Sequence, residues 1–170
     1  MAVSLDDAKF MERKDGNCKI DLAPVTSDAA LYAAACKDMY EMFEREVFDI
    51  IIASSVSGAT FASVVADRTH HGVAVASNRG VGKLRCEYQG HHGKVTLSMS
   101  EGVIRSGMKA AIVCDVLKGG KDIKALIDLI EGLGASVIKI GCFVEDSDYG
   151  ARKGLLDGYP MESRLVTEDY

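Results

Sequence analysis

Several features that would assign the sequence to a special class of protein are missing. No apolar run approaches the roughly 20 residues that span a bilayer, and residues 1–13 carry two aspartates where a secretion signal needs positive charge. An excess of basic residues is also lacking, because 20 Lys and Arg stand against 25 Asp and Glu, a net charge of -5. This balance argues against a broad phosphate-neutralising surface. We therefore expect a cytoplasmic protein that binds no membrane and no nucleic acid.

The cysteines and glycines lack the spacings of familiar motifs. The five cysteines are odd in number and contain no C-x-x-C pair, which indicates reduced thiols rather than a disulfide framework or a structural zinc site. Residues 119–121 (Gly-Gly-Lys) lack the upstream glycine and the following Ser or Thr of a Walker loop. The sequence therefore predicts neither a disulfide scaffold, nor a zinc domain, nor a P-loop protein.

The composition that remains is that of one globular domain. A chain of 170 residues matches the usual length of a single domain, about 100–200 residues. Its 48% apolar and 26% charged residues lie far from the composition of disordered chains. We expect residues 1–170 to form one domain around one core.

Predicted strands and helices alternate along the chain. Four apolar runs are predicted strands: 48–53, 73–76, 110–115 and 137–144. Residues 29–43, preceded by the capping residues 26–28, and residues 123–130 show helical patterns. The polar stretch 77–94 is predicted to be a flexible loop, and the alternation over 95–99 predicts an exposed or edge strand. Apolar strands that alternate with helices imply an α/β fold with a parallel sheet covered on both faces.

Polar or glycine-rich segments follow three of these strands, at residues 54–58, 77–84 and 115–122. Ligands of open α/β sheets bind outside the carboxyl ends of the strands. The third segment is the most informative, because Asp115 ends a buried strand and Gly119 and Gly120 lead into a helix N-terminus, whose free N–H groups attract phosphate. As a bare pattern it is equally compatible with a simple connection between strand and helix.

Residues 101–115 (EGVIRSGMKAAIVCD) resemble the adenine phosphoribosyltransferases and their type I relatives. The resemblance extends from residues 20–24 (Ile-Asp-Leu-Ala-Pro) through Glu87 and Tyr88 to residues 155–160. It implies a parallel sheet flanked by helices, with a small hood contributed mainly by residues 1–28. It also implies a homodimer that moves the phosphoribosyl group of phosphoribosyl pyrophosphate (PRPP) to a purine base, with Mg²⁺ bound through PRPP.

The resemblance makes Asp115 a candidate catalytic residue that binds the ribose hydroxyls of PRPP. The family signature has two adjacent acidic residues here, but Cys114 occupies the first position, and we expect it to be an inert packed thiol. The predicted phosphate-binding residues are Asp115, Lys118, Gly119, Gly120, Lys121 and Asp122. Asp122 replaces a hydroxyl residue of the family and would bring like charge towards a phosphate. Alternatively, Asp122 simply caps the following helix.

The resemblance also places a pyrophosphate-binding segment after the first strand. The family's Glu-Ala-Arg-Gly corresponds to Ser55, Val56, Ser57 and Gly58, which keep the glycine and lose both charges. The family's Arg-Lys falls on Ser77 and Asn78, and the nearby Arg79 and Lys83 are predicted to substitute for it. This basic stretch is equally compatible with a solvated mobile loop.

A second candidate catalytic residue lies in the predicted hood loop. The family's loop carries a glutamate that assists proton transfer at the base, and in this frame it becomes His91. An imidazole with an unperturbed pKa of about 6.5 suits acid–base work near neutrality. The pair His70 and His71 in another predicted loop shows, however, that adjacent histidines need no catalytic meaning.

Two functions remain open from the sequence alone. The first is a divergent purine phosphoribosyltransferase of the adenine salvage type, which binds PRPP with Mg²⁺ through Asp115 and to which we assign no direct protein ligand of the metal. The second is a catalytically inactive nucleotide-binding or regulatory protein that retains the fold. The simultaneous loss of several motif residues points to the second more strongly than any single change would.

Overall fold

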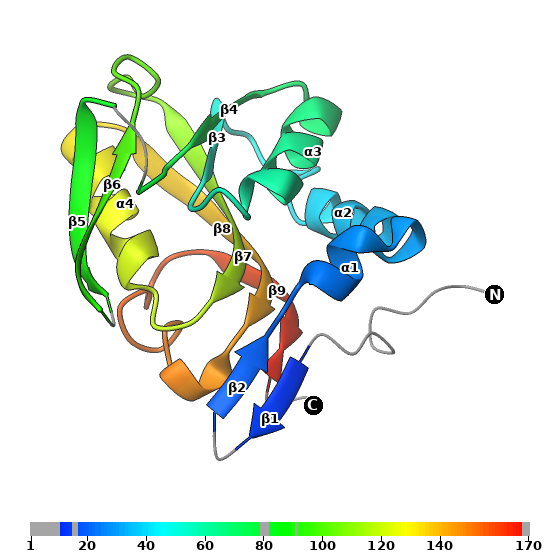
Figure 1. Ribbon diagram of the computed structural model, residues 1–170. Coiled ribbons are helices and arrows are strands. Elements are labelled where there is room, and N and C mark those ends of the chain that lie inside the picture. Colours follow the sequence, from blue (N-terminus) through cyan, green and yellow to red (C-terminus); the bar gives the residue numbers. More distant parts are fainter. Residues whose placement is uncertain (1–10, 15–16, 79–81, 91, 168–170) are drawn as a thin grey trace.

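A computed structural model describes residues 11–14, 17–78, 82–90 and 92–167 of the chain (Figure 1). Its centre is a five-stranded sheet in which every neighbouring pair is parallel. The strands in spatial order are β4 (Gly72–Val75), β3 (Ile50–Ala53), β7 (Lys109–Leu117), β8 (Ser136–Glu145) and β9 (Met161–Val166). The α/β fold with a parallel sheet, predicted from the apolar strands, is confirmed.

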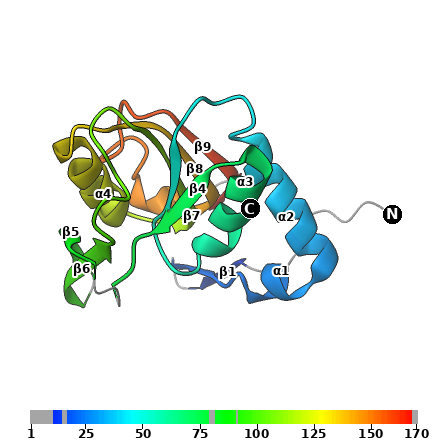
Figure 2. The ribbon, with the colours of Figure 1, turned by 90° about the horizontal axis from the view of Figure 1, so that it is seen from above.

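Helices cover both faces of the sheet, as Figure 2 shows. Helices α2 (Ala29–Glu41) and α3 (Ala59–Thr69) pack on one face, and α4 (Lys121–Gly132) packs on the other. Side chains of β7 alternate between the two cores: Ile112 and Cys114 lie under α4, whereas Val113 lies under α2 and α3. None of the helices in the described ranges is long and apolar enough to cross a membrane.

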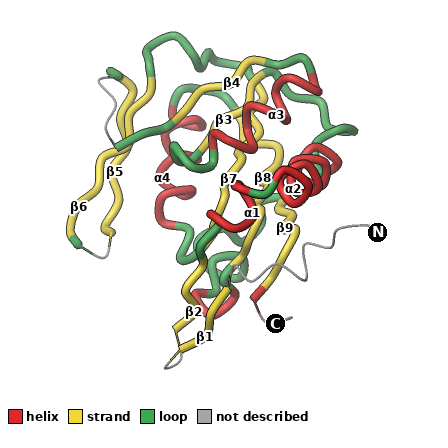
Figure 3. Tube along the Cα trace, turned by 45° about the vertical axis from the view of Figure 1, so that its right-hand side comes forward, coloured by secondary structure: helices red, strands yellow, loops and turns green. Residues whose placement is uncertain are grey.

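The N-terminal part contains elements that the sequence patterns did not predict. Strands β1 (Met11–Lys14) and β2 (Asn17–Ile20) form an antiparallel hairpin, and the short α1 (Ala23–Ser27) has Pro24 in its first turn. The next helix was predicted correctly, because the Asp28 carboxylate accepts hydrogen bonds of 2.9 Å from the N–H groups of Ala30 and Leu31. Figure 3 shows the β1–β2 hairpin standing apart from the central sheet.

The prediction of a loop over residues 77–94 is wrong in its second half. Residues Leu84–Gly90 form β5, which pairs antiparallel with β6 (Gly93–Met99) in a separate two-stranded sheet packed on α4. The strand escaped the pattern search because its outward residues are charged or polar, while Cys86 and Tyr88 turn towards α4. The strand predicted over 95–99 as exposed or at an edge is part of β6, one of the two strands of this separate sheet.

Gly141 of β8 is a glycine that the packing requires. A Cβ atom there would lie 2.3 Å from Cζ of Phe43, a fully buried ring that follows α2. Overpacking of this kind costs roughly 1–3 kcal/mol, so Gly141→Ala should lower the free energy of unfolding by about 2 kcal/mol in urea titrations. The matched control is Gly132→Ala, where a Cβ meets no atom within 4 Å and we expect no loss. Gly141→Ala with unchanged stability would contradict this packing argument.

Candidate active site

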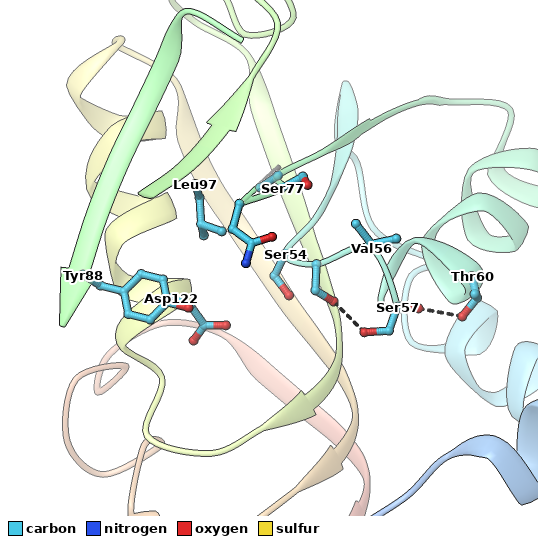
Figure 4. A pocket seen from close by; sticks show the side chains of 11 residues that line it. Ser54, Val56, Ser57, Thr60, Ser77, Tyr88, Leu97 and Asp122 are labelled. Carbon is cyan, nitrogen blue, oxygen red and sulfur yellow. Dashed lines mark hydrogen bonds between the residues drawn. The ribbon is translucent and has the colours of Figure 1, made fainter. Parts of the chain in front are cut away.

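Three adjoining pockets lie at the carboxyl ends of the central strands. The largest, of about 650 Å³, is bounded by the loop after β3, the segment after β4, and side chains of β5, β6 and α4 (Figure 4). Its lining residues are Ser54, Ser55, Val56, Ser57, Thr60, Ala76, Ser77, Asn78, Tyr88, Leu97 and Asp122. This pocket therefore lies at the edge of the sheet where the sequence predicted ligand binding.

The two smaller pockets share walls with the first. A pocket of about 280 Å³ surrounds the turn between β7 and α4 and shares Tyr88 and Asp122 with the largest pocket. Another, of about 350 Å³, lies between residues 20–23 and the start of α3, and shares Ser57 and Thr60 with the largest pocket. Asp115 lines this third pocket. A ligand of several linked groups can thus extend through all three.

Asp115 is held by the loop that follows β3. The hydroxyl of Ser55 donates to Oδ1 of Asp115 at 3.0 Å and accepts from the N–H of Gly58 at 2.8 Å. Gly58 permits this contact, because a Cβ atom there would lie 3.0 Å from Oγ of Ser55 and 3.4 Å from the carbonyl oxygen of Val113. Gly58 therefore supports the site by orienting Ser55, and its N–H donor is already used within the loop.

Cys114 contributes packing to the site rather than chemistry. It is 1% exposed in the core beneath α4, so its thiol points away from the cleft that Asp115 lines. A hydrogen bond with Cys142 and burial raise the pKa of the Cys114 thiol well above its ordinary value. The prediction of a packed thiol is confirmed, and Asp115 has no acidic neighbour at position 114.

The turn after β7 brings the predicted phosphate-binding residues together. Lys118, Gly119, Gly120, Lys121 and Asp122 all line the second pocket. Gly120 is the N-cap residue of α4 and adopts a left-handed conformation with φ of 71°, which favours glycine. The alternative that Asp122 caps the helix needs correction. Gly120 is the N-cap residue and Lys121 the first helical residue, so Asp122 is the second residue of the helix and not its cap.

The electrostatics of the cleft centre on Asp122. Burial raises the pKa of Asp122, and the charge of Asp115 raises it further, while the backbone N–H groups of Ile123 and Asp122 act in the opposite direction. Burial, together with the nearby Asp122, also raises the pKa of Tyr88. The cleft therefore combines a carboxyl group that is drawn towards its neutral form with two lysines on the same turn.

Other predicted site residues are not brought to the cleft. The ammonium of Lys83 lies 2.9 Å from the Glu101 carboxylate, with a side chain that is 79% exposed, and it lines none of the three pockets. Arg79 and His91 lie outside the described residues. Within the described ranges, no group of three or more His, Cys, Asp or Glu residues could hold a metal ion.

Some lining residues were missed by the sequence analysis. Thr60 lies in the first turn of α3 and was not singled out from the sequence. Tyr149 belongs to the one-turn 3-10 helix Ser147–Tyr149 after β8, and Lys118 Nζ lies 5.6 Å from its ring centroid. The rule that ligands bind after parallel strands, applied to the strand over 137–144, would have drawn attention to this tyrosine.

Comparison with known proteins identifies the family. Adenine phosphoribosyltransferase of Symbiobacterium thermophilum is 33% identical over 140 residues, which cover 79% of this chain and 81% of that protein. The chain belongs to the adenine phosphoribosyltransferase family. The adenine phosphoribosyltransferase of Thermotoga neapolitana is 30% identical over 149 residues, 86% of this chain and 87% of that protein. No protein-family model matches the chain.

Solved structures agree with this membership. The adenine phosphoribosyltransferase of Thermoanaerobacter pseudethanolicus has a TM-score of 0.84 and 28% identity, covering 96% of this chain and 99% of that chain. The enzyme of Rhodothermus marinus has a TM-score of 0.80 and 22% identity, covering 93% and 94%. The resemblance to an adenine phosphoribosyltransferase of type I fold, stated from the sequence, is confirmed.

Proposed function

We propose that this protein transfers the phosphoribosyl group of PRPP to adenine and releases AMP and pyrophosphate, a step of purine salvage. The observation that carries the proposal is Asp115, oriented by Ser55 at the carboxyl edge of the sheet in a chain of this family. The inactive alternative is not favoured, since the relatives that share most of the chain are named for the enzyme.

The three pockets fit the three parts of the reactants. The turn at Gly119 and Gly120, with two lysines, suits the 5-phosphate, because helix N-termini and ammonium groups attract anions. Asp115 borders the third pocket and contacts Ser55 of the first, so the ribose would lie where these pockets meet. The apolar walls of the third pocket suit the planar base, which leaves the largest pocket, lined by the hydroxyl groups of Ser55 and Ser57, for the pyrophosphate.

Positioning and charge stabilisation would supply most of the rate enhancement. Holding both reactants in line converts a bimolecular step into a unimolecular one. The bond between C1 of the ribose and the pyrophosphate oxygen breaks while a bond from C1 to the adenine ring nitrogen forms. The hydroxyl groups of Ser55 and Ser57 would donate to the departing pyrophosphate. His91 remains our proposed acceptor of the adenine proton.

Magnesium would be held mainly by PRPP itself. Mg²⁺ is usually bound through one or two carboxylates together with substrate phosphates and water. Asp115, with the hydroxyl group of Ser55 beside it, would supply one such carboxylate, and PRPP and water would supply the other ligands. When bound, the ion would neutralise charge on the pyrophosphate.

Further parts of the proposal extend beyond the cleft. We propose that Arg79 and Lys83 serve the pyrophosphate when PRPP binds. We also propose that residues 1–28 form a hood over the base within a single domain, and that the protein works as a cytoplasmic homodimer.

Incubation of the purified chain with adenine, PRPP and Mg²⁺ tests the proposal. We expect AMP and pyrophosphate to appear in equal amounts, measured by chromatography and by a coupled pyrophosphate assay. Omission of Mg²⁺ should abolish the reaction, and hypoxanthine or guanine in place of adenine should react more slowly. Absence of AMP at any concentration of PRPP would instead favour the inactive nucleotide-binding protein.

A further inference from the structure

Asp122 is an unusual group for a phosphate subsite. It lines both the largest pocket and the pocket around the phosphate turn, and Figure 4 shows its carboxylate beside Tyr88 and directed into the cleft. The same turn carries Lys118 and Lys121, whose ammonium groups suit an anion. An ionised Asp122 opposes this attraction, because two neighbouring anions disfavour each other's charged forms.

The carboxylate also competes with a phosphate for backbone donors. The N–H groups of Asp122 and Ile123 interact with it, and they belong to the first turn of the 12-residue α4, where an anion would bind. A protonated carboxyl group removes both conflicts. It carries no charge, it accepts more weakly from those N–H groups, and it donates one hydrogen bond to a phosphate oxygen.

Burial and one neighbouring charge favour the neutral form of Asp122. Asp115 of β7 adds its negative charge to the effect of burial. Cys86 and Tyr88 of β5 and Cys114 of β7 also lie near Asp122, whose charge adds to the effect of burial and raises the pKa of each, so all three are uncharged at neutral pH and add no charge of either sign around Asp122. The positive side chains of the hairpin have partners elsewhere, since Arg85 donates to the carbonyl oxygen of Gly82 and Lys94 pairs with Glu87.

Only the turn itself supplies positive charge near Asp122 among the described lining residues of the second pocket, through Lys118 and Lys121. We propose that Asp122 determines the protonation state in which phosphate binds. The Asp122 carboxyl group is neutral when a phosphate ester lies at the turn, so one proton enters the site with each bound phosphate. The lysines then pair with the phosphate, and the proton lies between the carboxyl group and a phosphate oxygen. This inference rests on the proposed function, because it takes the turn as the phosphate subsite.

Titration calorimetry with AMP counts this proton. At pH 8 a phosphate monoester, with a second pKa of about 6, is a dianion. The heat of binding in two buffers of different ionisation enthalpy gives the number of protons taken up. We expect about one proton for the wild-type protein and about none for Asp122→Asn. The Kd for AMP should rise about tenfold per pH unit in the wild type above the pKa of free Asp122, and stay flat in the variant.

Controls separate the charge of Asp122 from general effects. Asp128→Asn removes an exposed carboxylate that pairs with Lys124 on the same helix, and it should behave as the wild type. Adenosine, which lacks the phosphate, should bind without proton uptake. Asp122→Thr provides a second uncharged variant if the asparagine fails to fold.

Two results would overturn the inference. Wild-type protein that binds AMP without taking up a proton at any pH above the pKa of free Asp122 would show that Asp122 stays ionised or lies away from the phosphate. If AMP binds no better than adenosine at any pH, the phosphate does not bind at the turn. Failure of the proposed function is distinguishable, because a protein that forms no AMP from PRPP can still bind AMP with proton uptake.

Discussion

Asp115→Asn should lower kcat/KM for AMP formation by about 100- to 1,000-fold. Hydrogen bonds to a charged group contribute roughly 1.5–3 kcal/mol each, and the ribose offers two hydroxyl groups to this carboxylate. Asparagine keeps the shape of the side chain and can still accept from Ser55, so the variant removes charge while preserving the support seen at 3.0 Å. The measurement is a steady-state assay with varied PRPP at saturating adenine.

Asp128→Asn is the matched control for this variant, because it also removes one carboxylate but lies exposed on α4. It should keep full activity. Thermal melting should show that Asp115→Asn remains folded. Activity within about threefold of the wild type in Asp115→Asn would mean that the ribose does not meet this carboxylate, since a loss below 1 kcal/mol is too small for a charged contact.

The central fold was predictable because apolar runs report burial directly. Residues 110–115 read as a buried strand, and the residues of β7 from Ala110 to Cys114 are indeed at most 1% exposed. Asp28 was predictable for a local reason, since its side chain caps the helix that immediately follows it. Signals of this kind depend on near neighbours in the sequence.

What the sequence could not predict depends on distant partners. Strand β9 was not predicted, and it contains Ser163, which hydrogen-bonds to the distant Glu145 on β8. The role of Gly58 likewise depends on Val113, which lies on a different strand. Asp122 was recognised as a misfit for phosphate, but the burial and the Asp115 charge that favour its neutral form depend on the tertiary fold.

An ion pair with one buried partner links the end of β8 to the turn that follows it. Glu145 at the end of β8 is 4% exposed, and its carboxylate accepts from Arg152 Nε at 3.1 Å and from Ser163 Oγ at 2.6 Å. Arg152 also donates to the carbonyl oxygen of Met161 at 2.9 Å, which ties the turn after β8 to the edge strand β9. Burial alone would raise the pKa of Glu145, but Arg152 and Ser163 outweigh it and the pKa is lowered.

Arg152→Ala should therefore destabilise the protein strongly, by about 3 kcal/mol in urea unfolding, because removing one partner of a buried pair typically costs 3–5 kcal/mol. We expect the lower end of that range, since the Arg152 side chain is 41% exposed and water can partly replace it. The exposed Arg45, 92% accessible beside Glu44, provides the control, and Arg45→Ala should change stability by less than about 0.5 kcal/mol.

The pH dependence of Arg152→Ala separates lost charge pairing from lost packing. In the wild type, the lowered pKa of Glu145 contributes stability that is present above the unfolded value of about 4.3 and is lost as the pH falls through the folded value. In Arg152→Ala the burial of Glu145 is no longer offset, so its pKa rises and the sign reverses. The stability deficit of the variant should then shrink as the pH falls from 8 to 5. Adding Glu145→Gln should recover part of the deficit at pH 8, whereas a deficit that is independent of pH and unaffected by the second change would assign the loss to packing alone.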